Sequence, residues 1–112
     1  MDQIVKYQQI ILELLEEYSA IPPSYPTGLR DELVADTVRN HFQLISLGWE
    51  GHRFVYEVVF HLDIIEGKIW IQQNNTEANL AEELVERGIP KSDVVIGFQP
   101  AAVRALSGYS VE

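Results

Sequence analysis

Apolar positions near the start of the chain recur at steps of three and four residues. Between Asp2 and Tyr18 they are Ile4, Tyr7, Ile11, Leu14, Leu15 and Tyr18. This spacing places them on one stripe of a helix, so the pattern predicts an amphipathic N-terminal helix. The segment 21–28 that follows contains three prolines, each of which lacks an amide donor and restricts the residue before it. We expect a stiff connector within one fold.

Two Glu-Gly pairs in the middle of the chain predict β-hairpins. Glu50-Gly51 and Glu66-Gly67 each lie between β-rich runs at the spacing of a two-residue turn. Such turns would pair Leu47 with Phe54, Ile45 with Tyr56, Leu62 with Ile71 and Ile64 with Ile69, all on one apolar face shared with Val58 and Phe60. The run Glu32–Val38 would add an outer strand. The pattern predicts a four-stranded antiparallel meander.

The last third of the chain predicts short helices. Thr76 suits the N-cap of a helix that runs through Arg87, and Gly88 and Pro90 would end it. A short apolar run, residues 94–98, comes next. A brief helix would then begin at Pro100 and end before Gly108.

Together these elements predict an α+β fold. It has an N-terminal helix, a four-stranded antiparallel meander and C-terminal helices packed on the sheet. A length of 112 residues with 46% hydrophobic residues suffices for one core, so we expect a single domain over residues 1–112.

Charge argues against direct binding to DNA or to membranes. Seventeen acidic and eight basic residues give a formal net charge of −9, which repels phosphate backbones and anionic headgroups. The basic residues are dispersed, although folding could gather Arg39, Arg53 and Lys68 into a local positive patch, and direct DNA binding stays open as an alternative. The chain has no cysteine, and its first apolar run is interrupted by Glu13 without the features of a signal peptide or membrane span. We expect a cytoplasmic protein.

The three histidines raise the question of a metal or acid–base site. His41 belongs at the start of one strand, His52 at a hairpin tip and His61 on the sheet face opposite the apolar one. The deduced pairing therefore keeps them apart. Structural or surface roles are expected, with no metal and no cofactor.

The best polar cluster surrounds His61 and Asp63, which share a strand face. The deduced pairing puts Gln72 opposite His61 and Trp70 opposite Asp63, with Glu57 further along the same face. Catalysis would also need a nucleophile or bound water and an oxyanion donor, and the sequence identifies neither. No glycine-rich phosphate-binding pattern is present. We expect no enzyme activity and no catalytic residues.

A binding face requires less than a catalytic site does. An aromatic side chain beside hydrogen-bonding groups resembles a protein interface. The candidate partner-binding residues are Glu57, His61, Asp63, Trp70 and Gln72. The alternative is a sheet face covered by the protein's own helices, and the environment of Trp70 distinguishes the two.

Several short segments have a characteristic order and spacing: Gly48-Trp49-Glu50-Gly51, residues 61–72, Thr76-Glu77, residues 81–85, residues 88–91 and Gly97-Phe98. In this order and spacing the chain resembles the XisI family of cyanobacterial fdxN-element excision controlling factors. The resemblance implies an accessory role in excision of a DNA element, in which a separate site-specific recombinase cuts and rejoins the DNA. It also implies an XisH-like partner, for which this chain would be an adaptor. An interaction module unrelated to excision is the other alternative, and a homo-oligomer is compatible with both.

Overall fold

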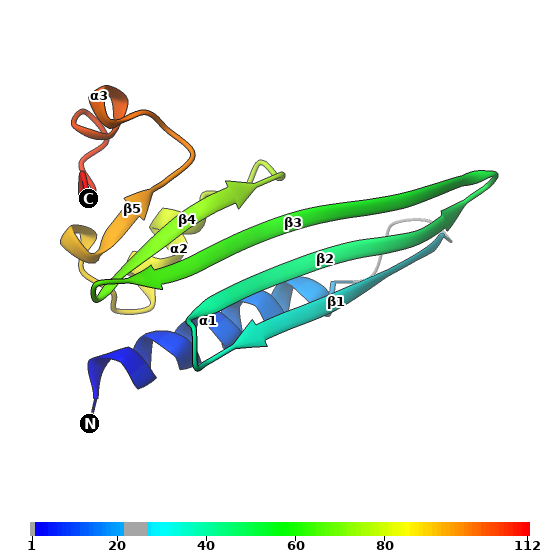
Figure 1. The fold of residues 1–112 in the computed structure, drawn as a ribbon, viewed down its shortest axis with the longest axis horizontal. Helices are drawn as coiled ribbons and strands as arrows, with labels where there is room; N and C mark the ends of the chain where they lie inside the picture. The colour runs from blue at the N-terminus through cyan, green and yellow to red at the C-terminus, as the bar shows by residue number, and fades with distance from the viewer. Residues whose placement is uncertain (1, 22–26) are drawn as a thin grey trace.

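The computed structural model describes residues 2–21 and 27–112. Most of the expected proline-rich connector, residues 22–26, lies outside the described residues. The elements, in chain order, are α1 (Gln3–Ser19), β1 (Gly28–Asp36), β2 (His41–Glu50), β3 (Arg53–Ile65), β4 (Lys68–Asn74), α2 (Leu80–Glu86), the 3-10 helix η1 (Lys91–Asp93), β5 (Val94–Ile96) and α3 (Ala101–Arg104). The α+β class, the N-terminal helix and the C-terminal helices are as predicted (Figure 1).

Helix α1 forms as its apolar spacing predicts. The Asp2 side chain caps it by accepting a hydrogen bond from the amide of Ile4, at 3.0 Å. The stripe that faces the sheet is buried and consists of Tyr7, Ile10, Ile11, Leu14 and Leu15. At roughly 1.5 to 3 kcal/mol for each large apolar side chain removed from water, this stripe anchors the helix on the sheet.

The sheet has five strands rather than four, in the order β1-β2-β3-β4-β5. Strands β1 to β4 form the predicted antiparallel meander. Strand β5 pairs parallel to β4 along three residues, after α2 returns the chain to the same end of the sheet. A three-residue apolar run is too short to distinguish a strand from a buried turn by its pattern alone. The outer strand β1 is also longer at its start than the predicted segment Glu32–Val38.

One hairpin register is as predicted and the other is not. Around Glu66-Gly67, Ile65 pairs with Lys68, so the expected Leu62–Ile71 and Ile64–Ile69 pairs form. At the other hairpin, Glu50 pairs with Arg53, which makes Gly51 and His52 the turn residues. Gly51 has a φ of 65°, which suits glycine at the first central position of a two-residue turn. The turn is therefore Gly51-His52, one residue later in the chain than the predicted Glu50-Gly51. The partners of Leu47 and Ile45 are consequently Tyr56 and Val58.

A β-bulge at Val59 decides which face of the sheet each side chain of β3 occupies. Phe60 pairs with Leu44 and Val58 pairs with Ile45, so Val59 has no partner on β2. Before the bulge, Phe54, Tyr56 and Val58 therefore point away from the core that Phe60 and Leu62 enter. The expectation of one apolar face for all of these residues is wrong, because one extra residue reverses the alternation.

The C-terminal helices differ from expectation only in detail. Helix α2 is capped by Asn79, whose side chain accepts from the amide of Glu82, and not by Thr76. The Thr76 hydroxyl accepts from the amide of Ala78, so it stabilises the turn that precedes the helix. Pro100 is the N-cap residue of α3, as its position suggested.

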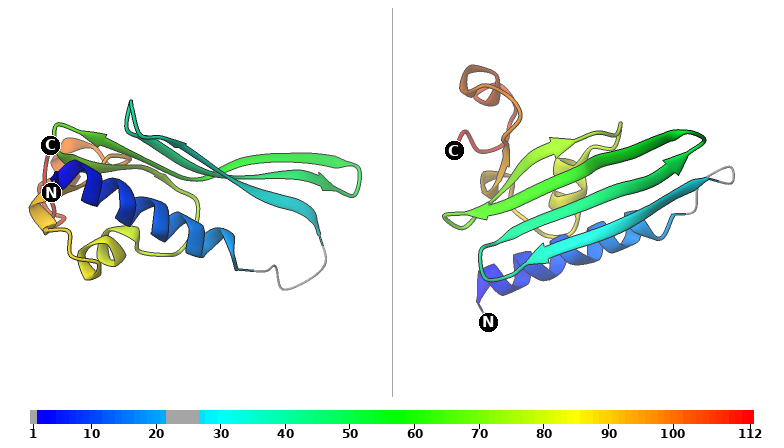
Figure 2. Two further views of the ribbon diagram at one scale, coloured as in Figure 1. Left: turned by 90° about the horizontal axis from the view of Figure 1, so that it is seen from below. Right: turned by 45° about the vertical axis from the view of Figure 1, so that its right-hand side comes forward.

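The core lies on one side of the sheet. Helices α1 and α2 both cover that side (Figure 2), where Phe42, Leu44, Phe60, Leu62 and Ile71 are buried against them. The hairpin of β2 and β3 extends well beyond the end of α1 (Figure 1). No helix of the described residues lies over the opposite side of β1, β2 and β3, which is here called the open face (Figure 2).

Candidate functional site on the open face

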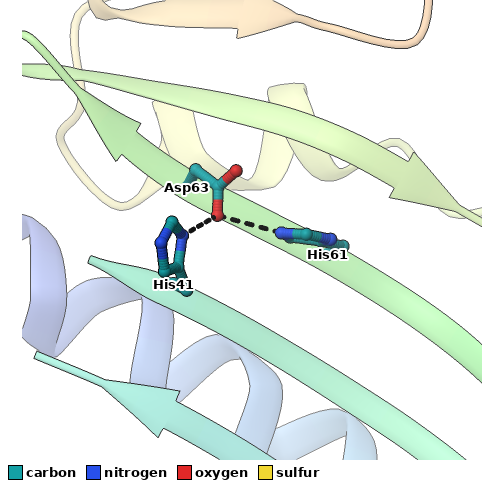
Figure 3. Close-up of side chains that lie close together, drawn as sticks. All are labelled: His41, His61 and Asp63. Carbon is teal, nitrogen blue, oxygen red and sulfur yellow. Dashed lines mark hydrogen bonds and ion pairs between the residues drawn. The ribbon is translucent and has the colours of Figure 1, made fainter. Parts of the chain in front are cut away.

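Three polar side chains meet on the open face where β2 begins. Nδ1 of His41 lies 2.8 Å from Oδ1 of Asp63, and Nε2 of His61 lies 2.9 Å from the same oxygen (Figure 3). His41 and Asp63 are directly paired across β2 and β3, and His61 is two residues before Asp63 on β3. The expectation that the histidines stay apart is wrong for this pair, because the shifted turn at Gly51-His52 and the bulge at Val59 together set the register that places His41 opposite Asp63.

Asp63 is the buried member of this triad. Its residue is 8% exposed, whereas the His41 side chain is 56% exposed. Burial by itself raises the pKa of Asp63, but hydrogen bonds from His41 and His61, with a further one from Gln72, more than offset it and hold the pKa below the usual range. The carboxylate is therefore charged at neutral pH.

Two glutamines complete the surroundings of the triad. Nε2 of Gln72 lies 3.3 Å from Oδ2 of Asp63 and donates to it. The side-chain amide of Gln43 lies 3.4 Å from Nδ1 of His61, on the residue paired with it across the strands. The triad is thus held from both sides by neutral hydrogen-bonding groups.

The candidate partner-binding residues divide into two groups. His61, Asp63, Trp70 and Gln72 lie together, and Trp70 is paired with Asp63 as deduced. Gln72 is not opposite His61, because a second bulge leaves Gln72 unpaired and brings Gln73 to that position. Glu57 does not join them.

The position of Glu57 has the same cause as the exposed aromatics. It precedes the bulge at Val59, so it points to the face opposite that of His61 and Asp63. There its carboxylate accepts a hydrogen bond from the side chain of Asn75, at 2.9 Å. An alternation count without the bulge places it wrongly.

Trp70 is partly covered by the protein's own C-terminal segment. The guanidinium of Arg104 lies 5.4 Å from the centre of its ring, a cation–π distance. The chain also passes closely at Gly97, where an added Cβ would lie 3.1 Å from the Trp70 ring. The face around Trp70 is therefore shared between the protein's own tail and solvent.

A cavity of about 500 Å³ opens beside Trp70 at the edge of this tail. It is lined by Ile65, Glu66, Lys68, Trp70, Arg104 and Glu112. Both cations in it are engaged: Lys68 donates to the Ser110 hydroxyl at 2.9 Å, and Arg104 donates to the carbonyl of Val111 at 2.7 Å. The cavity therefore offers little free positive charge to a ligand.

Three exposed aromatic side chains lie at the far end of the β2–β3 hairpin. Trp49, Phe54 and Tyr56 are 60%, 50% and 63% exposed, and the rings of Trp49 and Phe54 pack edge to face at 5.3 Å. We call these three residues the aromatic patch. The sequence pattern predicted Phe54 and Tyr56 in the core. The signal for the other register is the glycine at position 51, which readily adopts the positive φ that the turn requires there.

The cations proposed to form a positive patch do not gather. Arg53 is at the tip of the β2–β3 hairpin, whereas Arg39 and Lys68 are at the turns at the other end of the sheet (Figure 1). Arg53 pairs with Glu50 at 3.4 Å, and Arg39 pairs with Asp36 at 3.2 Å. Arg53 and Arg39 therefore each share their charge with a neighbouring acid.

Within the described residues, the fold is that of a small α+β protein whose mostly antiparallel sheet carries α1 and α2 on one side and leaves β1, β2 and β3 open on the other (Figure 2). The sequence matches the XisI family, described as XisI protein, over residues 1–111, and the chain belongs to this family. No curated protein matches it.

Two solved structures are similar to the chain along nearly its whole length. One is an XisI-like protein from Anabaena variabilis ATCC 29413, with 41% identity, a TM-score of 0.89, and coverage of 97% of this chain and 99% of the other. The second is the fdxN element excision controlling factor XisI from the same organism, with 29% identity, a TM-score of 0.85, and coverage of 99% and 100%. Among residues 2–21 and 27–112, no helix is long and apolar enough to cross a membrane.

Proposed function

We propose that this protein is a non-catalytic accessory factor for the excision of a DNA element, and that it works as an adaptor for an XisH-like partner. The excision role is supported by membership of the XisI family and by similarity to a structure named as an fdxN element excision controlling factor. The observation that carries the adaptor role is the aromatic patch on the open face.

The aromatic patch has the properties of a protein-binding surface. Exposed Trp and Tyr side chains are enriched where partners dock, since they contribute large contact area at little cost in conformational entropy. At this end of the hairpin, α1 no longer lies behind the strands (Figure 1). The patch therefore protrudes from the body of the protein, where a partner can reach it.

Charge favours a protein partner over DNA as the direct contact. A net charge of −9 opposes the approach of phosphates, and the cations Arg39 and Arg53 are each paired with a neighbouring acid. An acidic adaptor can still act on DNA through a partner that supplies the basic surface.

The direct test mixes the purified chain with an XisH-like protein at micromolar concentration and follows association by size-exclusion chromatography and calorimetry. We expect a complex with the wild-type chain and a large loss of affinity for Trp49→Ser and Tyr56→Ser. Leu106→Ser is the matched control, because Leu106 is 87% exposed and comes just after α3, which is remote from the hairpin tip (Figure 1). Equal affinity of all four proteins would place the interface elsewhere, and no association at all would remove the adaptor role.

A gel shift at low salt separates the alternatives. The chain alone should leave DNA unshifted, because phosphate contacts are strongest at low ionic strength and would be visible there. A shift that disappears as salt is added would favour direct DNA binding. A third outcome would favour an interaction module unrelated to excision. The chain would bind an XisH-like protein, but deletion of its gene would leave excision of the DNA element unchanged.

A further inference from the structure

The triad of His41, His61 and Asp63 brings together two imidazole nitrogens and a carboxylate oxygen. The three ligand atoms all lie within 4.8 Å of one another. We propose that this triad binds a divalent transition-metal ion, with Zn²⁺ as the ion that fits it best. The proposal goes beyond the adaptor role and does not depend on it.

The directions of the ring nitrogens support a shared ion. Both His41 and His61 direct a nitrogen at Oδ1 of Asp63, while Oδ2 is used by Gln72. Neutral rings that presented lone pairs here would repel the carboxylate, so each ring must either carry a proton on that nitrogen or face a cation. One metal ion among the three atoms satisfies all of them at once.

The distances allow the ion to enter with small movements. Metal–ligand bonds of about 2.0 to 2.2 Å place the atoms of a tetrahedral shell about 3.3 Å apart. The two nitrogens lie 2.8 and 2.9 Å from the carboxylate oxygen and within 4.8 Å of each other, so both must move about half an ångström away from the oxygen while they reach the tetrahedral spacing between themselves. The exposed side chain of His41 can supply this movement by rotating.

The surroundings match those of known metal sites. A metal-bound imidazole usually gives its other N–H to a hydrogen-bond acceptor, which fixes the ring. Nδ1 of His61 has Gln43 at 3.4 Å, and a side-chain amide can present its oxygen to that N–H. Gln72 donates a hydrogen bond to the second oxygen of Asp63. Both ligands on β3 therefore have a positioning neighbour.

The donor set also indicates which metal to expect. Two imidazoles and one carboxylate suit Zn²⁺ and neighbouring transition metals, whereas Mg²⁺ and Ca²⁺ prefer oxygen ligands alone. Three protein ligands leave a fourth position, and the exposure of His41 places it toward solvent. An external donor, either water or a side chain of another molecule, would complete the shell.

The test uses the untagged full-length chain, stripped with a chelator and dialysed. Calorimetric titration with Zn²⁺ should give one ion per chain and a raised melting temperature that the chelator reverses. His41→Ala and Asp63→Asn should abolish the binding. The matched control is His52→Ala, since His52 lies at the hairpin tip, outside the triad, and should bind Zn²⁺ as the wild type does.

A second measurement on the unmutated chain covers the case in which a variant fails to fold. Paramagnetic Co²⁺ should broaden the imidazole proton resonances of His41 and His61 and leave those of His52 sharp. Gln43→Ala should weaken Zn²⁺ binding about 10- to 100-fold without removing it. Two results would overturn the proposal: no binding heat and no melting shift with either Zn²⁺ or Co²⁺, or equal broadening of the resonances of all three histidines. His41 and His61 would then only hydrogen-bond to Asp63.

Discussion

The hydroxyl of Tyr18 donates a hydrogen bond of 2.5 Å to a carboxylate oxygen of Glu83, and so joins the end of α1 to α2. The ring of Tyr18 also packs edge to face on Phe60, with the centroids 5.0 Å apart. Arg87 adds a two-pronged contact to Glu17, at 2.8 and 2.9 Å. The two helices that cover the sheet are thus tied to each other as well as to the core.

Tyr18 should make stability depend on alkaline pH. Burial first, and then the hydrogen bond to Glu83, raise its pKa from 10 to about 12. A folded-state pKa above the unfolded one stabilises the protein fully below pH 10, and this contribution is lost as the pH rises through 12. Urea unfolding should show the free energy of unfolding of the wild type falling as the pH rises from 10 to 12. Tyr18→Phe should be less stable than the wild type at neutral pH, and its free energy of unfolding should fall less over the same range. Parallel curves for the two proteins would contradict the assignment.

Asp63 should have the opposite dependence at acidic pH. Its pKa in the folded protein is below the reference value of 3.8, so its stabilising contribution is complete above that value and is lost as the pH falls through the folded pKa. Asp63→Asn should be less stable than the wild type at neutral pH, and the two should converge on acidification. Glu57→Gln, which alters a carboxylate on the other face, serves as the control. A difference that stayed constant down to acid unfolding would argue against a charged Asp63.

Leu14 tests the packing of α1 on the sheet. Its side chain is fully buried, so Leu14→Ala should lower the free energy of unfolding by about 2 to 5 kcal/mol through lost burial and a residual cavity. Leu106→Ala removes the same atoms from a position that is 87% exposed and should change stability by less than about 0.5 kcal/mol. Chemical denaturation gives the free energy of unfolding of each variant, provided that its dependence on denaturant concentration has the same slope as in the wild type. Similar losses in the two variants would mean that α1 contributes little to the core.

Gly48 tests how β1 is held at the edge of the sheet. An added Cβ would lie 2.2 Å from the carbonyl oxygen of Gly28, and Gly48 has a φ of 141°. Gly48→Ala should therefore separate the start of β1 from β2 and cost more than the roughly 1 kcal/mol of an ordinary glycine exchange. Gly51→Ala, where a Cβ meets nothing within 4 Å, isolates the backbone cost alone. Amide hydrogen exchange should rise in β1 for Gly48→Ala only; unchanged protection would refute the close approach.

The elements themselves could be predicted from local pattern. The helical stripe that includes Ile11 and Leu14 repeats over four turns, and the Glu66-Gly67 turn is flanked by two short alternating runs, so both signals are repeated along the chain. The three residues of β5 gave no such repetition. Their place in the sheet depends on α2 bringing them beside β4, which is a tertiary relation.

The candidate site was harder to predict because its composition depends on two bulges. Alternation places His61 and Asp63 together correctly, since no bulge separates them. It fails for Glu57, which is on the other side of Val59, and for His41, whose partner depends on both the shifted turn at Gly51-His52 and the bulge. A bulge adds one residue to one strand only, and the packing that favours it lies outside the local sequence.

The bulge at Val59 reverses the alternation of side chains between the two faces of the sheet within the single strand β3. Residues with even numbers face the core after it and face outward before it, so the 13 residues of β3 contribute to both the interior and the surface patch. Removing this single residue would restore one uniform phase and turn Phe54 and Tyr56 toward the side of α1, and it would turn Glu57 outward. The presence of one extra residue in β3 therefore decides which side chains form the outer surface, as much as their chemistry does. A relative that lacked this residue would display a different surface on the same fold.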